Sequence, residues 1–404
     1  MALLAAFVVP FTALRFGVVG LGEILVLTSL IFILNLNRGS LQISDPVFPL
    51  VQFWVAYIIV IVFGFAFNLF VLGYNSGTLS GAAFDISSYL IILAAVLLLG
   101  DERIYHGDSP HVFFRELFSL WAIAYSLLYI ISLFTPQVLG FPLKYYNNFS
   151  PLVENVHQAA MVTAAMPFIM WHLASMGRVA FRLFCVISGG LFMIMALQSG
   201  STKALVAVFV GSVVSASLLA FGVLMRRSSV LLRVAAIICV GVLGASLLVA
   251  NADYIYPMAV QFFQNNDGSS AREGLYTIGF NHALDSIIFG YGPGPHISYD
   301  LGGEFSDAHN TALTIILQGG ILAIVISIVA AMAVIRRTAS SAFLVGALSS
   351  ISMYLIGGDI LRRLPIWIIV VGVLYLSREC RNTARLANGI RSIGGPVRNG
   401  IGRR

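Results

Sequence analysis

The feature that most constrains this chain is its series of long apolar stretches. They recur from one end of the sequence to the other with few charges inside them. Each has about 20 residues, the length that a helix needs to cross a bilayer. Because lipid offers the backbone no hydrogen-bond partner, such stretches must be helical, and the alternating pattern of a membrane barrel is absent. The sequence therefore predicts an all-α, polytopic integral membrane protein.

Composition agrees with this prediction. Of the 404 residues, 59% are hydrophobic and 10% are charged, whereas soluble domains have about 25% charged residues. No segment is left for a soluble domain, so residues 1–404 are expected to form a single transmembrane domain of about 12 helices. The expected spans lie near residues 2–14, 17–36, 50–73, 84–100, 112–134, 156–174, 181–198, 204–224, 231–250, 310–335, 341–357 and 364–378.

The placement of Lys and Arg predicts the orientation, because cytoplasmic loops hold an excess of both. The bias puts both termini in the cytoplasm, together with a basic tail, residues 379–404, which is expected to be unstructured and to bind lipid headgroups. The basic residues that remain on the outer side are Arg15, Lys144, Lys203, Arg272, Arg362 and Arg363. Such misplaced cations indicate an anionic ligand at the outer surface. Pairing with outer acids such as Asp300, Glu304, Asp307 or Asp359 is the alternative.

One long outer loop, residues 251–308, is expected to carry part of a functional site, since structureless loops of more than about 15 residues are uncommon otherwise. Within it, an amphipathic helix is predicted from Ser270 to about Ile288, lying at the membrane interface. A Gly/Pro turn follows, from Gly290 to Pro295. That turn lacks the preceding strand and the lysine of a phosphate-binding loop, so no nucleotide site is indicated.

A few ionisable residues stand at or inside the predicted spans. His309, at the mouth of the span that begins at residue 310, can serve as a general base or as a hydrogen-bond partner for a reacting hydroxyl. Glu23 lies inside the second span and is expected either to contact substrate or to pair with Arg15. Asp85 and Glu116 lie near span ends and are expected to be interfacial.

Three separated segments, within roughly residues 155–335, resemble a known superfamily. They are Ser199-Gly-Ser-Thr-Lys203; Ser270-Ala-Arg272 followed by Phe289-Gly-Tyr-Gly-Pro-Gly; and Ala308-His309-Asn310 followed by Leu313, Leu317 and Gly319. A looser match is Asn155-Val-His157. In order and spacing they resemble the O-antigen ligase and O-antigen polymerase superfamily of bacterial membrane glycosyltransferases. Lys203 stands where that family usually has Arg, and Lys lacks the planar bidentate contact that Arg offers to phosphate.

The resemblance implies a GT-C-like fold in the bacterial inner membrane with its active site facing the periplasm. It implies a metal-independent, inverting transfer without a cofactor, from a glycan on undecaprenyl diphosphate to a glycan or to lipid A core. In this hypothesis Lys203 and Arg272 bind the diphosphate and His309 acts on the acceptor hydroxyl. The other residues expected to bind substrate are Arg362, Arg363, Asn310, His157 and Arg15.

Three functions therefore stay open. The first is a polymerase of O-antigen or of another surface polysaccharide, which is favoured slightly. The second is an O-antigen ligase that uses lipid A core as acceptor. The third is a lipid-linked glycan flippase or transporter, although matching halves and midplane charges, which are typical of transporters, are not seen. The bilayer and the lipid-linked glycan are the expected partners, and no nucleic acid is expected.

Overall fold

The computed structural model describes residues 1–16, 19–71, 79–105, 109–145, 148–153, 156–225, 269–298, 305–306 and 310–393. Within these ranges the chain forms 12 α-helices and four two-stranded hairpins. Seven of the described helices are long and apolar enough to cross a membrane. The predicted all-α, multi-pass membrane protein is confirmed.

The helices are α1 Ala2–Val8, α2 Leu21–Leu36, α3 Phe48–Phe70, α4 Leu79–Gly100, α5 Pro110–Phe134, α6 Val156–Met176, α7 Val179–Gln198, α8 Thr202–Met225, α11 Ser269–Asp285, α12 Thr311–Thr338, α13 Ala342–Gly357 and α14 Leu364–Ile393. The antiparallel hairpins pair β1 Arg15–Phe16 with β2 Val19–Gly20, β3 Gln137–Val138 with β4 Phe141–Pro142, β5 Lys144–Tyr145 with β6 Asn148–Phe149, and β7 Ile297–Ser298 with β8 Phe305–Ser306. In residue range, the predicted spans coincide with α2 to α8 and α12 to α14, but α2, α13 and α14 are not among the seven candidate membrane spans. The span predicted at 231–250 lies outside the described residues.

Two predictions at the chain ends were wrong. The span expected at 2–14 is a helix of only 7 residues, which is about 10 Å long and too short to cross a bilayer; Pro10 follows it, and proline cannot continue a helix. The tail expected to be unstructured from residue 379 continues α14 as far as Ile393. Its Ala, Leu and Arg residues favour helix, and the helix ends just before Gly394.

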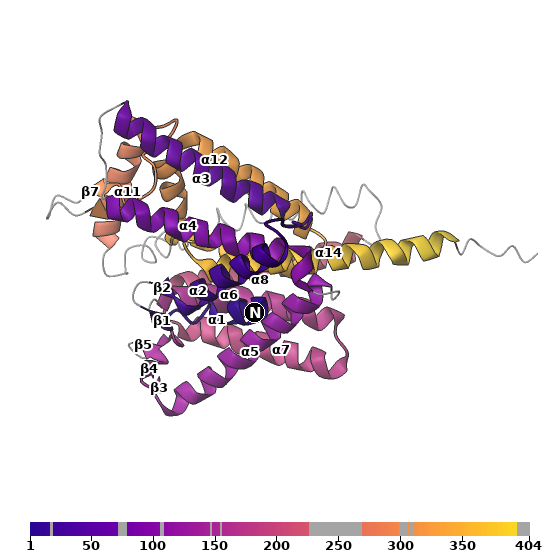
Figure 1. Cartoon of the computed structure of the whole chain (residues 1–404). Coiled ribbons are helices and arrows are strands. Elements are labelled where there is room, and N and C mark those ends of the chain that lie inside the picture. Colours follow the sequence, from indigo (N-terminus) through magenta and orange to yellow (C-terminus); the bar gives the residue numbers. More distant parts are fainter. Residues whose placement is uncertain are drawn as a thin grey trace, which may run out of the picture.

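α6 forms the centre of one helix group, with 83% of its span buried. It packs against α7, α8 and α13, whereas α3 packs against α4 and α12 in a second group. Figure 1 shows α3 and α12 side by side, with the hairpins gathered at one end of the molecule and the C-terminal part of α14 pointing away from the other. Exposed apolar side chains on the outside of α3 and α12, such as Ile59 and Val325, face the lipid.

We call the two ends of the bundle the hairpin end and the basic end. The hairpin end carries the β-hairpins and the starts of α2, α6, α12 and α14. The basic end carries the described residues Arg103, Arg178, Arg182, Arg336, Arg337 and Arg378. At the basic end Arg103 pairs with Asp101 at 3.0 Å, and Arg378 lies 3.7 Å from Glu102. The second ion pair joins the segment between α4 and α5 to α14.

Candidate functional site

Helix α12 is broken at Gly320, and the Gly/Pro turn fills the break. Gly320 has φ 58° and ψ −152°, a conformation that is essentially restricted to glycine. The carbonyls of Leu317 and Gln318 therefore lose their helical partners. They accept hydrogen bonds instead from the backbone N–H groups of Tyr291, at 2.6 Å, and Gly292, at 2.9 Å. The turn thus satisfies backbone groups that lipid could not.

The other side of the turn is held by α3. The Asn68 amide donates to the carbonyl oxygen of Gly290 at 2.6 Å and to that of Gly64 at 2.8 Å. Gly290 has φ 64°, and a β-carbon there would overlap the backbone of Gln318 and Gly319. The Gly/Pro run is therefore a packing element between α3 and α12. Close packing against the two helices therefore accounts for the glycines of the run, and no bound phosphate is needed to explain them.

A buried polar network lies directly beside this junction. We call it the Asp85 network; its members are Tyr57, Asp85, Tyr89, Gln318, Asp359 and Arg362. The Asp85 Oδ2 atom accepts hydrogen bonds from Gln318 Nε2 at 2.7 Å and from the Gly294 backbone at 3.0 Å. The Gln318 Oε1 atom in turn accepts from the Tyr57 hydroxyl at 2.9 Å and the Tyr89 hydroxyl at 2.8 Å. The network joins α3, α4, α12 and the Gly/Pro turn.

Asp85, which was expected to be interfacial, lies near the start of α4 and is enclosed by other parts of the protein. The residue is only 1% exposed, because its partners come from elements far away in the sequence. A buried carboxylate needs a cation and hydrogen-bond donors to offset its lost hydration. Arg362 supplies the cation, with Nη1 at 2.9 Å from Asp85 Oδ1.

Arg362 was predicted to bind substrate, with pairing to Asp359 as the alternative. Its guanidinium contacts Asp359 at 2.7 Å as well as Asp85. Asp359 is itself held by the Leu361 backbone N–H at 3.0 Å. Arg362 thus lies between two carboxylates and is 17% exposed, which fits a positioning role in the segment that joins α13 and α14.

The start of α12 is tied to the same segment. Asn310 caps the helix by accepting the backbone N–H of Leu313 at 3.1 Å, a common role for Asn at this position. The Thr311 hydroxyl donates to the carbonyl of Gly358 at 2.6 Å and accepts the N–H of Ile360 at 3.0 Å. Asn310 and Arg362, both predicted from the sequence, are thereby brought to one place.

Lys203 lies in the first turn of α8, at the same end of the molecule. α8 packs against α13, and Ser215 in α8 donates to the carbonyl of Ala342 at the start of α13. Gly211 lies one turn before Ser215 in α8, and it faces Gly346, which lies one turn after Ala342 in α13. The helices are therefore antiparallel, which places the start of α8 beside the end of α13.

Arg272 belongs to α11, which packs on the first half of α12 through Leu275, Leu313 and Leu317. The predicted helix at 270–288 is confirmed as Ser269–Asp285, and it leaves Phe280 exposed. The side chain of Arg272, like His309 and the acids at 300, 304 and 307, lies outside what the structure describes.

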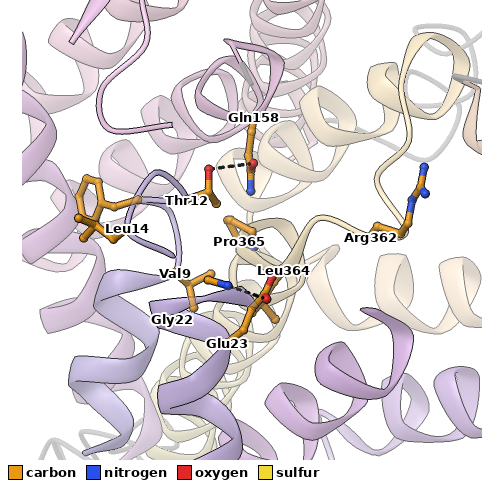
Figure 2. A pocket seen from close by; sticks show the side chains of 11 residues that line it. Val9, Thr12, Leu14, Gly22, Glu23, Gln158, Arg362, Leu364 and Pro365 are labelled. Carbon is orange, nitrogen blue, oxygen red and sulfur yellow. Dashed lines mark hydrogen bonds between the residues drawn. The ribbon is translucent and has the colours of Figure 1, made fainter. Parts of the chain in front are cut away.

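A small cavity opens on the other side of the α13–α14 segment. It has a volume of about 30 Å³ and lies between the β1–β2 hairpin, α2, α6 and Pro365. Its polar lining residues are Thr12, Glu23, Gln158 and Arg362 (Figure 2). The Glu23 carboxylate accepts the backbone N–H of Gly20 at 3.0 Å and so caps α2. The side chain of Arg15, its expected partner, is not among those described.

The remaining predicted residues lie at the same end. His157 is exposed in the first turn of α6, Arg363 follows Arg362, and Arg15 lies in β1. Within the described ranges, no group of three or more His, Cys, Asp or Glu residues could hold a metal ion. Sequence reasoning missed Gln318 and Gln158. A polar side chain inside an apolar span is the signal that could have found Gln318.

Comparison with known protein families gives a match over part of the chain. Residues 183–328 match the model of a family described as O-antigen ligase. The match covers Lys203, Arg272, the Gly/Pro turn and the break in α12, and it leaves Asp85 and Arg362 outside. No curated protein and no solved structure matches the chain. Residues 183–328 of this multi-pass membrane protein are therefore similar to the O-antigen ligase family, a family of glycosyltransferase-like membrane enzymes.

Proposed function

We propose that this protein transfers a glycan from undecaprenyl diphosphate to an acceptor hydroxyl, as a polymerase of O-antigen or of another surface polysaccharide. One observation carries the proposal: the starts of α8 and α12, which bear Lys203 and Asn310, meet the α13–α14 segment at the hairpin end. The bonds of Thr311 to Gly358 and Ile360 and the antiparallel packing of α8 on α13 support this convergence.

The electrostatics of the hairpin end suit a lipid diphosphate. A helix carries partial positive charge at its N-terminus, and its free N–H groups point toward an anion there. α6, α8, α12 and α14 all begin at this end. Lys203 and Arg272 add full charges, so both are proposed to bind the diphosphate and to stabilise the charge that builds on it as the bond to sugar C1 breaks.

His309 directly precedes Asn310, the residue that caps α12. We assign it to the acceptor: it orients the hydroxyl and takes its proton as the oxygen bonds to C1 on the face opposite the leaving diphosphate. The products are the inverted glycoside and undecaprenyl diphosphate. Because the diphosphate is already a good leaving group, the proposed step requires no metal and no second activated molecule.

The orientation is proposed from charge. The basic end should face the cytoplasm, since positively charged loops are retained there. The hairpin end and the loop at 251–308 then face the periplasm of a bacterial inner membrane, with both termini and the basic tail at 379–404 inside. Undecaprenol would lie in the bilayer, and its diphosphate would reach the hairpin end at the membrane surface.

Complementation of a deletion strain tests the roles of the charged residues. Lys203→Ala, Arg272→Ala and His309→Ala should each reduce the glycan product at least tenfold, while the protein stays in the membrane. Arg178→Ala is a matched control because this exposed arginine lies at the basic end. Near-normal product in His309→Ala would refute the assignment of this residue to the acceptor.

Purified protein separates the candidate functions. Incubation with lipid-linked glycan alone should give a ladder of longer lipid-linked chains, as a polymerase does. Product that appears only when lipid A core is added would identify a ligase instead. Movement of the lipid-linked glycan across a vesicle without any covalent product would identify a transporter.

A further inference from the structure

The cavity beside Pro365 is lined by residues that have no role in the proposed diphosphate site. It is partly open to the exterior, and its volume of about 30 Å³ admits a hydroxyl group or a water molecule. Its walls are apolar at Val9, Leu14 and Leu364, and its polar lining residues are Thr12, Glu23, Gln158 and Arg362. It therefore has both an apolar surface and converging hydrogen-bonding groups, as small-molecule sites do.

Gln158 supplies an uncommitted donor. The side chain is 7% exposed, and its Oε1 atom accepts the Thr12 hydroxyl at 3.3 Å. Within the described part of the chain, its Nε2 atom makes no hydrogen bond, although an amide nitrogen carries two donors. This nitrogen is not among the fully enclosed polar atoms, so it is accessible from the cavity and free to donate to a molecule that enters it.

Glu23 supplies the complementary acceptor. One carboxylate oxygen, Oε2, accepts the Gly20 N–H, and the other has no hydrogen bond from a described residue. In Figure 2 Glu23 and Gln158 approach the cavity from opposite sides. An acceptor and a donor that face each other across so small a space match a hydroxyl group, which donates and accepts at once.

The charge of the cavity excludes the diphosphate as its occupant. Glu23 would repel an anion. The only cation in the described lining is Arg362, and Figure 2 shows its guanidinium directed away from the cavity, where it contacts Asp85 and Asp359. A neutral polyhydroxy compound is therefore the class of ligand that this lining suits.

We propose that the cavity between α2, α6 and Pro365 is a subsite for a neutral sugar of the glycan substrate, which inserts a hydroxyl-bearing edge between Glu23 and Gln158. The proposal rests on the proposed glycan transfer, because the cavity shares the α13–α14 segment with that site. The sugar belongs either to the acceptor glycan or to the donor glycan, and both present neutral sugar hydroxyl groups. The subsite would hold the glycan by hydroxyl contacts while the cations hold the diphosphate.

Saturation-transfer NMR on the full chain in nanodiscs tests the proposal directly. The probes are neutral hexoses, the hexuronates that match them, and inorganic pyrophosphate. Neutral hexoses should give signals, and the hexuronates should not, because their carboxylate meets Glu23. Gln158→Leu should lower the hexose signal at least fivefold. Glu23→Gln should also lower the hexose signal, and it should reduce the difference between the hexose signal and the hexuronate signal. The amide oxygen of the new glutamine can still cap α2.

The controls are Gln42→Leu and Glu102→Gln, exposed residues away from the cavity; both should leave the hexose signal unchanged. No hexose signal, an equal signal in Gln158→Leu, or pyrophosphate competing with hexose would each overturn the subsite. In transfer assays Gln158→Leu should raise KM about tenfold with little change in kcat. The substrate whose KM rises, donor or acceptor, identifies which glycan occupies the cavity.

These outcomes are distinct from failure of the proposed function. If Lys203→Ala and His309→Ala retain normal transfer, the proposed chemistry is wrong, whereas the hexose signals still report on the cavity. If those two variants lose transfer and Gln158→Leu leaves both KM and the hexose signal unchanged, only the subsite is refuted.

Discussion

Asp85→Ala should destabilise the protein more than the removal of any exposed carboxylate that forms an ion pair. The substitution removes the ion pair of Asp85 with Arg362 at 2.9 Å. It also removes the acceptor of Gln318 Nε2 and of the Gly294 N–H. Gln318 and the Gly294 N–H then remain buried without an acceptor, while Arg362 stays 17% exposed. The change thus acts on the junction of α4, α12 and the Gly/Pro turn at once.

The magnitude follows from burial. Breaking a buried ion pair by removing one member costs about 3–5 kcal/mol, and each buried donor without an acceptor costs about 1–3 kcal/mol. Arg362 keeps its contact with Asp359, which lowers the first cost. Because contributions within one network are not additive, we expect a total loss of about 4 kcal/mol for Asp85→Ala. Asp85→Asn, which keeps one acceptor, should lose about half of that.

Reversible unfolding in mixed micelles, followed by tryptophan fluorescence, measures this loss. Trp54 and Trp367 lie beside the network with ring centroids 4.7 Å apart, so they report on it locally. The control is Asp45→Ala, since this carboxylate is 86% exposed and 3.5 Å from Arg337; it should change stability by less than about 1 kcal/mol. If Asp85→Ala and Asp45→Ala differ by less than about 1 kcal/mol, the network does not hold the junction together.

Gly320→Ala should abolish monodisperse, detergent-soluble protein, because φ is 58° and a β-carbon would overlap the carbonyl of Ile288. The control, Gly190→Ala, changes a helical position with open space around it and should be tolerated or stabilising. Equal yields of soluble protein from the two variants would refute the break in α12. Gln318→Leu should cost about 2–3 kcal/mol in the same unfolding assay, since two buried tyrosine hydroxyls lose their acceptor; no change would mean that water replaces it. Asn310→Ala should lower the free energy of unfolding by about 1 kcal/mol because the helix cap is lost. Asn310→Asp should restore that stability, since Asp also caps helices. If Asn310→Asp restores stability but lowers glycan transfer, the residue contacts the diphosphate. Lys203→Arg should support at least wild-type product in complementation while Lys203→Ala does not, and failure of Lys203→Arg would show that the site requires the compact ammonium.

Most of the fold could be predicted from the sequence because span length and hydropathy are local properties. Helices α3 to α8 begin and end within about five residues of the predicted bounds. α1 differs because Pro10 ends the helix after two turns. The break in α12 was not predicted. A Gly-Gly pair inside an apolar helix is tolerated, and only the packing of a distant turn against Gly320 reveals why the helix is interrupted.

The candidate site was predicted only in part. Misplaced cations and the resemblance pointed to Lys203, Arg272 and Arg362, because charge in an outer loop is visible in the sequence. The role of Asp85 was missed since nothing near it in the sequence explains a buried carboxylate; its partner Arg362 lies 277 residues away. Gln158 was missed for the same reason. Its surroundings come from the β1–β2 hairpin and from the α13–α14 segment.

The separation of Asp85 from Arg362 sets an order of events during biosynthesis. α4 enters the membrane long before Arg362 is made, and at about 5–20 residues per second the ribosome takes roughly 15–55 s to cover the 277 residues between them. Throughout that interval the carboxylate must stay hydrated or at the membrane surface. α4 therefore cannot take its final depth until the chain is nearly complete. A nascent chain that stops short of residue 362 leaves the Asp85 carboxylate without its cation and therefore hydrated, so the junction of α4 and α12 can close only in a finished copy.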